Sequence, residues 1–154
     1  MKNNTIVMID DEYTKIRYFE KALVDKGFDV KVLRDINEAW NYFTVKREEV
    51  CAIILDLLLP KPKILGPLSE GQPIGVILQK HLLEQLKVTG QIVPVAVLTQ
   101  LSELDNQDIF EHLRRQQKKE YANWPLQAWM KVGLDPDDFA LEFTTWLNLL
   151  KSLP

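Results

Sequence analysis

The feature that most constrains this chain is a regular alternation of short apolar runs with segments of helical periodicity. Five runs are rich in apolar and β-branched residues and short enough to be strands, at about residues 5–9, 28–33, 51–55, 93–98 and 126–131. Helical patterns follow them, at about residues 12–26, 36–43, 74–90, 103–120 and 136–150. Because this alternation predicts a parallel sheet with right-handed crossovers, we expect one α/β domain over residues 1–154, built on a doubly wound five-stranded sheet.

Local signals support several of these segments. Gly27 follows the first helical pattern, where a left-handed cap is expected. Residues 51–55 are almost continuously apolar, as expected for the centre of a parallel sheet that is covered on both faces. The last helix is predicted to begin at Asp135-Pro136, a capping residue followed by proline.

Composition excludes several classes of protein. The net charge of −3 lacks the positive excess that nucleic-acid or membrane-surface binding requires. One cysteine and two histidines cannot make an internal disulfide or a zinc cluster. The sequence contains no apolar run near the roughly 20 residues that span a bilayer, and its start does not resemble a signal peptide. We therefore expect a cytoplasmic protein that binds neither nucleic acid nor membranes.

Charged and polar residues follow the predicted strands where ligands bind in doubly wound sheets, at the carboxyl ends. The first strand is followed by Asp10 and Asp11, the third by Asp56, and the fourth and fifth end in Thr99 and Lys131. Clustered carboxylates repel one another, so keeping them ionised needs a cation. An all-oxygen set favours Mg²⁺, and one aspartate could attack phosphorus as a nucleophile. A single acid at a strand end is usually only a helix cap, but four strand ends with suitable residues favour phosphoryl chemistry.

At this point the sequence resembles response-regulator receiver domains, the phospho-acceptor modules of two-component signalling. The segments that match are IVMIDDE, IILDLLLP, VAVLT and WMK, which occur in the family's order over essentially the full chain. The resemblance implies the flavodoxin-like receiver fold, with strand order 2-1-3-4-5. It also implies a signalling domain that is not an enzyme in the usual sense, and partners that include a histidine kinase or phosphotransfer protein and a downstream protein target.

The same resemblance implies roles for individual residues. Asp56 would be the phospho-acceptor, with Thr99 bonding a phosphoryl oxygen and Lys131 pairing with Asp56 or its phosphate. Asp10 and Asp11 would hold Mg²⁺ together with Asp56 and the backbone carbonyl of Leu58. Because the sequence ends soon after the last helical pattern, we expect a stand-alone receiver whose output passes through another protein.

Three positions depart from the family pattern. Val132 replaces the usual proline after the lysine, so the turn there either contains a costly cis bond or is built differently. Gln100 replaces a small residue after Thr99. Ala128 stands where an aromatic switch is expected, and the neighbouring Trp129 should face the other side of its strand. These departures favour an alternative, a receiver-like interaction module that no longer switches by phosphorylation.

Other readings are less well supported. A haloacid-dehalogenase-type phosphatase would need a second aspartate where Leu58 stands, and a flavodoxin-like flavin binder would be repelled by the acids after the first strand. The proline- and glycine-rich loop at residues 57–73 is either a lid or docking surface near Asp56, or a tolerated insertion. The basic residues at 114–119 are either a solvated helix face or a docking face.

Overall fold

The computed structural model describes residues 4–34, 38–39, 41–42, 50–56, 93–100, 111 and 126–151. The loop at 57–73, Leu58, the helix expected at 74–90 and the basic segment at 114–119 lie outside the described residues. Of the helix expected at 103–120 only residue 111 is described, and it is helical; residues 38–39 and 41–42 are helical within the segment expected at 36–43. None of the described helices has the length and apolar character that a membrane-spanning segment needs.

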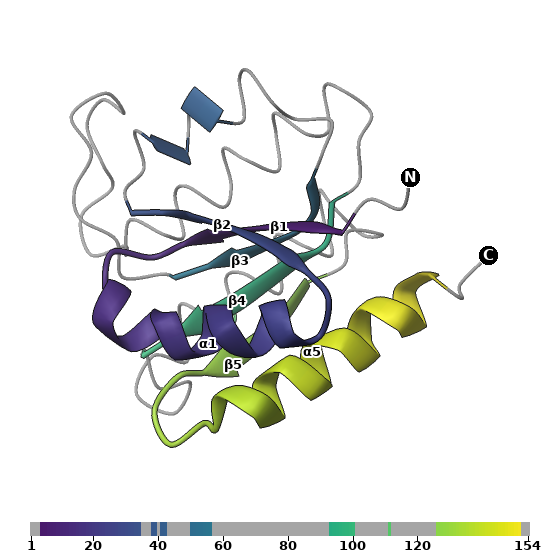
Figure 1. Ribbon diagram of the computed structural model, residues 1–154. Coiled ribbons are helices and arrows are strands. Elements are labelled where there is room, and N and C mark those ends of the chain that lie inside the picture. Colours follow the sequence, from purple (N-terminus) through teal and green to yellow (C-terminus); the bar gives the residue numbers. More distant parts are fainter. Residues whose placement is uncertain are drawn as a thin grey trace.

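The described strands form one parallel sheet, with helices on the face seen below it in Figure 1. In chain order the elements are β1 (Thr5–Ile9), α1 (Tyr13–Asp25), β2 (Asp29–Leu33), β3 (Val50–Leu55), β4 (Val95–Thr99), β5 (Leu126–Met130) and α5 (Pro136–Lys151). The strand order is β2-β1-β3-β4-β5 and every neighbouring pair is parallel. The predicted fold class and strand order are therefore confirmed.

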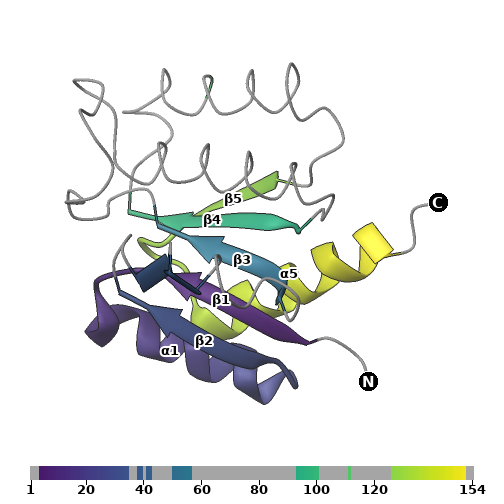
Figure 2. The same cartoon turned by 90° about the horizontal axis from the view of Figure 1, so that it is seen from above.

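An apolar layer fills the space between the sheet and the two helices α1 and α5. These helices lie side by side on the same face, as both views show (Figures 1 and 2). Phe139 and Phe143 of α5 are fully buried, and the ring of Phe139 meets that of Phe19 from α1 edge-on, with 5.6 Å between centroids. Edge-to-face packing of this kind adds about 1 kcal/mol to the stabilisation from buried area.

Trp129 belongs to this apolar layer, as its place beside Ala128 in an alternating strand predicts. Its ring lies 5.2 Å from that of Phe139 and 5.8 Å from that of Trp146, both edge-on. The indole Nε1 donates a hydrogen bond of 2.8 Å to a carboxylate oxygen of Glu142 on α5. Ala128, in contrast, is exposed. Among the described residues of β5, Trp129 is therefore the aromatic side chain next to Ala128, and it is held on the α5 side of the sheet.

The helix ends follow the predicted capping. Gly27 has φ +97°, and the N–H groups of Gly27 and Phe28 donate to the carbonyls of Val24 and Leu23 at 2.9 and 3.2 Å. This is the Schellman pattern, in which a left-handed residue lets the chain leave the helix with its last carbonyls satisfied. At the start of α5, Oδ1 of Asp135 accepts hydrogen bonds from the N–H groups of Asp137 and Asp138.

The turn after Lys131 is built without a cis bond. The described residues contain no cis peptide, so the Lys131–Val132 bond is trans. Gly133 instead adopts φ +73°, and the N–H of Leu134 donates to the carbonyl of Lys131 at 3.3 Å. A left-handed glycine therefore reverses the chain where the family pattern has proline.

Cys51 lies near the start of β3 and is partly buried against the core. Burial raises the pKa of its thiol, so the thiol stays protonated near neutral pH and is a poor nucleophile. Cys51 is therefore an unreactive thiol packed against the core.

Candidate functional site

The candidate site lies at the carboxyl edge of the sheet, where backbone hydrogen bonds continue one residue beyond the strands. The N–H of Asp10 donates to the carbonyl of Leu33 at 2.9 Å, and the N–H of Asp56 donates to that of Ile9 at 3.0 Å. The N–H of Lys131 donates to the carbonyl of Thr99 at 2.7 Å. Each charged residue is therefore the first residue after its strand and is fixed in position by the neighbouring strand.

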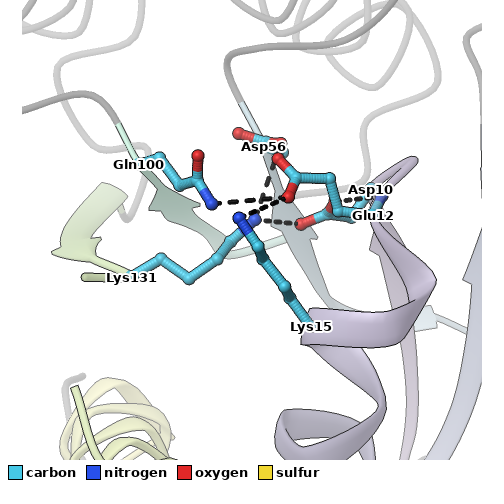
Figure 3. Close-up of polar contacts among 6 residues, drawn as sticks. All are labelled: Asp10, Glu12, Lys15, Asp56, Gln100 and Lys131. Atoms are coloured by element: carbon cyan, nitrogen blue, oxygen red, sulfur yellow. Dashed lines mark hydrogen bonds and ion pairs between the residues drawn. The ribbon is translucent and has the colours of Figure 1, made fainter. Parts of the chain in front are cut away.

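Lys131 joins two buried carboxylates (Figure 3). Its Nζ donates a 2.7 Å hydrogen bond to Oδ2 of Asp10 and lies 3.6 Å from Oδ2 of Asp56. All three residues are nearly inaccessible, with exposed fractions of 3% for Asp10, 2% for Asp56 and 6% for Lys131. The predicted pairing of Lys131 with Asp56 is present, and the shorter contact is with Asp10.

The charges of Asp10, Asp56 and Lys131 favour the binding of another cation at this edge. Burial raises the pKa of the Asp10 carboxyl; the hydrogen bond from Lys131 opposes this rise, and the charge of Asp56 adds to it. When both aspartates are ionised, the described residues place one ammonium against two carboxylates at a site with little access to water, so negative charge is in excess among them. A bound cation would remove that imbalance.

The carboxylates lie close enough together to share a metal ion. Asp10, Asp11 and Asp56 each place an oxygen within 4.8 Å of those of the other two, and Asp11 is the exposed member. Three carboxylate oxygens without nitrogen or sulfur suit a hard cation such as Mg²⁺, which usually keeps several water ligands as well. The chemistry of this donor set therefore fits the predicted metal. The fourth expected ligand, the carbonyl of Leu58, lies outside the described residues.

β4 lies next to β3 on the side opposite β1, and Thr99 and Gln100 stand at its carboxyl end. Thr99 is fully buried as the last residue of the strand. Gln100 follows it, and its Nε2 reaches Oε2 of Glu12 at 3.4 Å. Glu12 also pairs with Lys15 at 3.0 Å. The sequence pattern marks Gln100 only as a departure from a small residue and assigns no role to Glu12. A pairing 88 residues apart leaves no local signal in the sequence.

By sequence, the chain matches no protein-family model and no curated protein. Many solved structures, in contrast, share its fold. A response regulator receiver domain protein from Clostridium thermocellum has 21% identity and a TM-score of 0.64, over 96% of each chain. A two-component response regulator from Clostridium difficile has 17% identity and a TM-score of 0.66, over 97% of this chain and 99% of its own. A response regulator from Thermotoga maritima has 15% identity and a TM-score of 0.66, over 96% and 99%.

Each of these similarities covers nearly the full length of this chain and of the solved structure. At identities of 21% and below they show a shared fold, which confirms the resemblance to receiver domains at the level of architecture. Fold and function are separate properties, so the activity must be argued from the side chains at the carboxyl edge.

Proposed function

We propose that residues 1–154 act as one cytoplasmic receiver unit of two-component signalling. Asp56 accepts a phosphoryl group from the phosphohistidine of a histidine kinase or phosphotransfer protein, and the phosphorylated form signals through contacts with a downstream protein. The observation that carries this proposal is the buried arrangement of Asp56, Asp10 and Lys131 at the carboxyl edge of a receiver-type sheet. The function is signalling, and the only chemistry is phosphorylation and dephosphorylation of the chain itself.

Transfer to Asp56 needs a nucleophile, charge neutralisation and a fixed geometry. A carboxylate oxygen of Asp56 forms the new O–P bond while the P–N bond to the donor imidazole breaks, and the bonding pair leaves with the imidazole nitrogen. The backbone hydrogen bond from Asp56 to Ile9 holds the nucleophile in place during the transfer. The donor nitrogen then regains a proton and departs as neutral imidazole.

Positive charge at the site acts on the transferred group. Lys131 is 3.6 Å from Asp56 and can turn from Asp10 to a new phosphoryl oxygen, while Thr99 offers a hydroxyl donor at the end of β4. Asp10, Asp11, Asp56 and the carbonyl of Leu58 would hold Mg²⁺, which would supply the remaining positive charge for the phosphoryl oxygens. Asp10 would then no longer depend on Lys131 as its counterion.

A second function, an interaction module that does not switch by phosphorylation, is favoured by one specific observation. Ala128 is exposed and carries no ring, and Trp129 is held on the opposite face by α5 through Glu142 and the Phe139 ring. In the described part of β5, no aromatic side chain can therefore move toward Thr99 after phosphorylation. A structural response to phosphorylation would have to involve another helix, strand or loop.

Intact-mass measurement after incubation with Mg²⁺ and acetyl phosphate separates the two functions. We expect one phosphoryl adduct on the wild-type chain and none on Asp56→Asn, which retains the size of the side chain but not its nucleophilic carboxylate. Gln127→Ala, an exposed position on β5, serves as a matched control and should be labelled like wild type. An unlabelled wild type that nevertheless binds Mg²⁺ would overturn the phospho-acceptor proposal and support the interaction module.

A further inference from the structure

A chain of polar contacts runs along the rim of the site, outside the buried Asp10–Lys131–Asp56 group. Nε2 of Gln100 approaches Oε2 of Glu12 at 3.4 Å, and the same oxygen lies 3.0 Å from Nζ of Lys15 (Figure 3). The backbone N–H of Glu12 is itself fixed by a 2.9 Å hydrogen bond to Oδ1 of Asp10. We call the contact between Gln100 and Glu12 the rim bridge.

The strand order shows where the rim bridge runs. Glu12 follows β1 and Gln100 follows β4, and these are the two strands that flank β3. A contact between residues beyond the ends of β1 and β4 must therefore pass the carboxyl end of β3, where Asp56 is located. Figure 3 draws Gln100, Glu12, Asp10 and Asp56 together at this edge, with a dashed line for the contact between Gln100 and Glu12.

Only long side chains can make this connection. Neighbouring strands are about 4.8 Å apart, so β1 and β4 are separated by about 10 Å across β3. Gln100 and Glu12 each contribute a side chain of intermediate exposure, and Lys15 holds the glutamate from the first turn of α1. With alanine or glycine at position 100, the side chain would be too short to reach Glu12 past the carboxyl end of β3.

We propose that Gln100 is a specificity-determining residue whose bridge to Glu12 restricts access to Asp56. The proposal rests on the phospho-acceptor function given above and adds a selection among phosphodonors. A small acyl phosphate must wait for the bridge to open by itself. A protein donor can open it, because contacts around the rim supply binding energy that a small donor lacks. Attacking water meets the same restriction after transfer, so the bridge also prolongs the life of the phosphorylated form.

Phosphorylation kinetics test the effect on donors and on hydrolysis. With acetyl phosphate and saturating Mg²⁺, Gln100→Ala should be labelled about two- to tenfold faster than wild type, the range that one hydrogen bond carries. Its adduct should be lost faster by a similar factor. Gln100→Met retains the length of the side chain but cannot donate, so it shows whether the hydrogen bond or the bulk restricts access; Gln127→Ala should behave as wild type. Rates for Gln100→Ala equal to those of wild type would overturn the proposal.

A second measurement needs no phosphorylation, and it separates failure of the bridge from failure of the phospho-acceptor function. In chains that carry Cys51→Ser and Asp56→Cys, the rate of thiol modification by a small methanethiosulfonate reports access to position 56. Adding Gln100→Ala should raise this rate by about the same two- to tenfold, while adding Gln127→Ala should leave it unchanged. Circular dichroism confirms that each chain is folded. Equal modification rates with and without Gln100 would contradict the rim bridge even if the wild type is phosphorylated, and faster modification would support it even if the wild type is not.

Discussion

Two buried regions of the molecule differ in the side chains that they bury. The layer between the sheet and helices α1 and α5 is apolar, whereas the carboxyl edge of the same sheet is charged. The layer is filled by aromatic and aliphatic side chains such as Phe139 and Phe143, whose burial stabilises the fold. The edge buries Asp10, Asp56 and Lys131, whose charges lose solvation and, among the described residues, include one more carboxylate than ammonium. The stability that the apolar layer provides therefore allows an unfavourable arrangement of charges to be maintained at the edge.

The largest expected effect comes from breaking the apolar layer. Phe143→Ala removes a fully buried ring that contacts Phe139 and Phe28, and should lower the free energy of unfolding by about 3–5 kcal/mol. Urea denaturation measures this change. Leu149→Ala on the same helix is a control, because Leu149 is 62% exposed and its loss should change stability by about 0.5 kcal/mol or less. A similar loss in both variants would show that the layer does not carry the stability assigned to it.

Removing the ammonium group of Lys131 at the carboxyl edge should cause a smaller loss of stability. Lys131→Ala leaves Asp10 and Asp56 without their ammonium partner and should cost about 3 kcal/mol near neutral pH. The pKa of Asp10 is already raised by burial, and losing Lys131 removes the hydrogen bond that opposes this rise. A raised carboxyl pKa means that the folded state binds more protons than the unfolded state, so stability falls as pH rises through that range.

The sign of this pH dependence distinguishes a charge effect from a packing effect. Urea titrations of wild type and Lys131→Ala should show a difference in the free energy of unfolding that is large at pH 7. This difference should shrink as the pH falls through the range in which the Asp10 carboxyl becomes protonated, because its pKa is raised in the folded state. Saturating Mg²⁺ should also reduce the difference, since the variant retains the three carboxylates. A loss that is independent of both pH and Mg²⁺ would assign Lys131 a packing role only.

The smallest effect has the opposite sign. Asp56→Asn removes one of two buried like charges while Lys131 keeps its 2.7 Å contact with Asp10, so the variant should be more stable than wild type by about 1 kcal/mol without metal. Mg²⁺ should then reverse the order. At ten times its dissociation constant it stabilises the wild type by about 1.4 kcal/mol and has little effect on the variant. Thermal unfolding with and without Mg²⁺ measures both parts, and a destabilised variant in the absence of metal would contradict the electrostatic comparison.

Most of the fold and the charged site could be predicted because both depend on local pattern. The run TIVMI gave the limits of β1, and the cap at Asp135 gave the start of α5. The positions of Asp10, Asp56 and Lys131 followed from a general property of parallel sheets, in which the residues after successive strands meet at one edge. Alternation in β5 also placed Trp129 on the face opposite Ala128, since neighbouring strand residues point to opposite sides.

The remaining features depend on side-chain reach and on three-dimensional neighbours. The sequence left two possibilities for the turn after Lys131, and the trans bond with left-handed Gly133 decides between them. The preference of Lys131 for Asp10 over Asp56 is a difference between 2.7 and 3.6 Å, which no spacing rule resolves. The contact between Gln100 and Glu12 requires the strand order as well as the lengths of both side chains.

The backbone hydrogen bonds that continue past the strands give the site a dynamic property. Asp10, Asp56 and Lys131 each share an amide proton with a neighbouring strand, so their main chains separate only when the sheet itself opens. Gln100 lies beyond the last described strand residue of β4, and its side chain can rearrange without any such opening. The main chain of the charged centre therefore separates only through a cooperative, rarely populated partial unfolding, whereas side chains such as Gln100 can fluctuate on the much faster timescale of side-chain rotation.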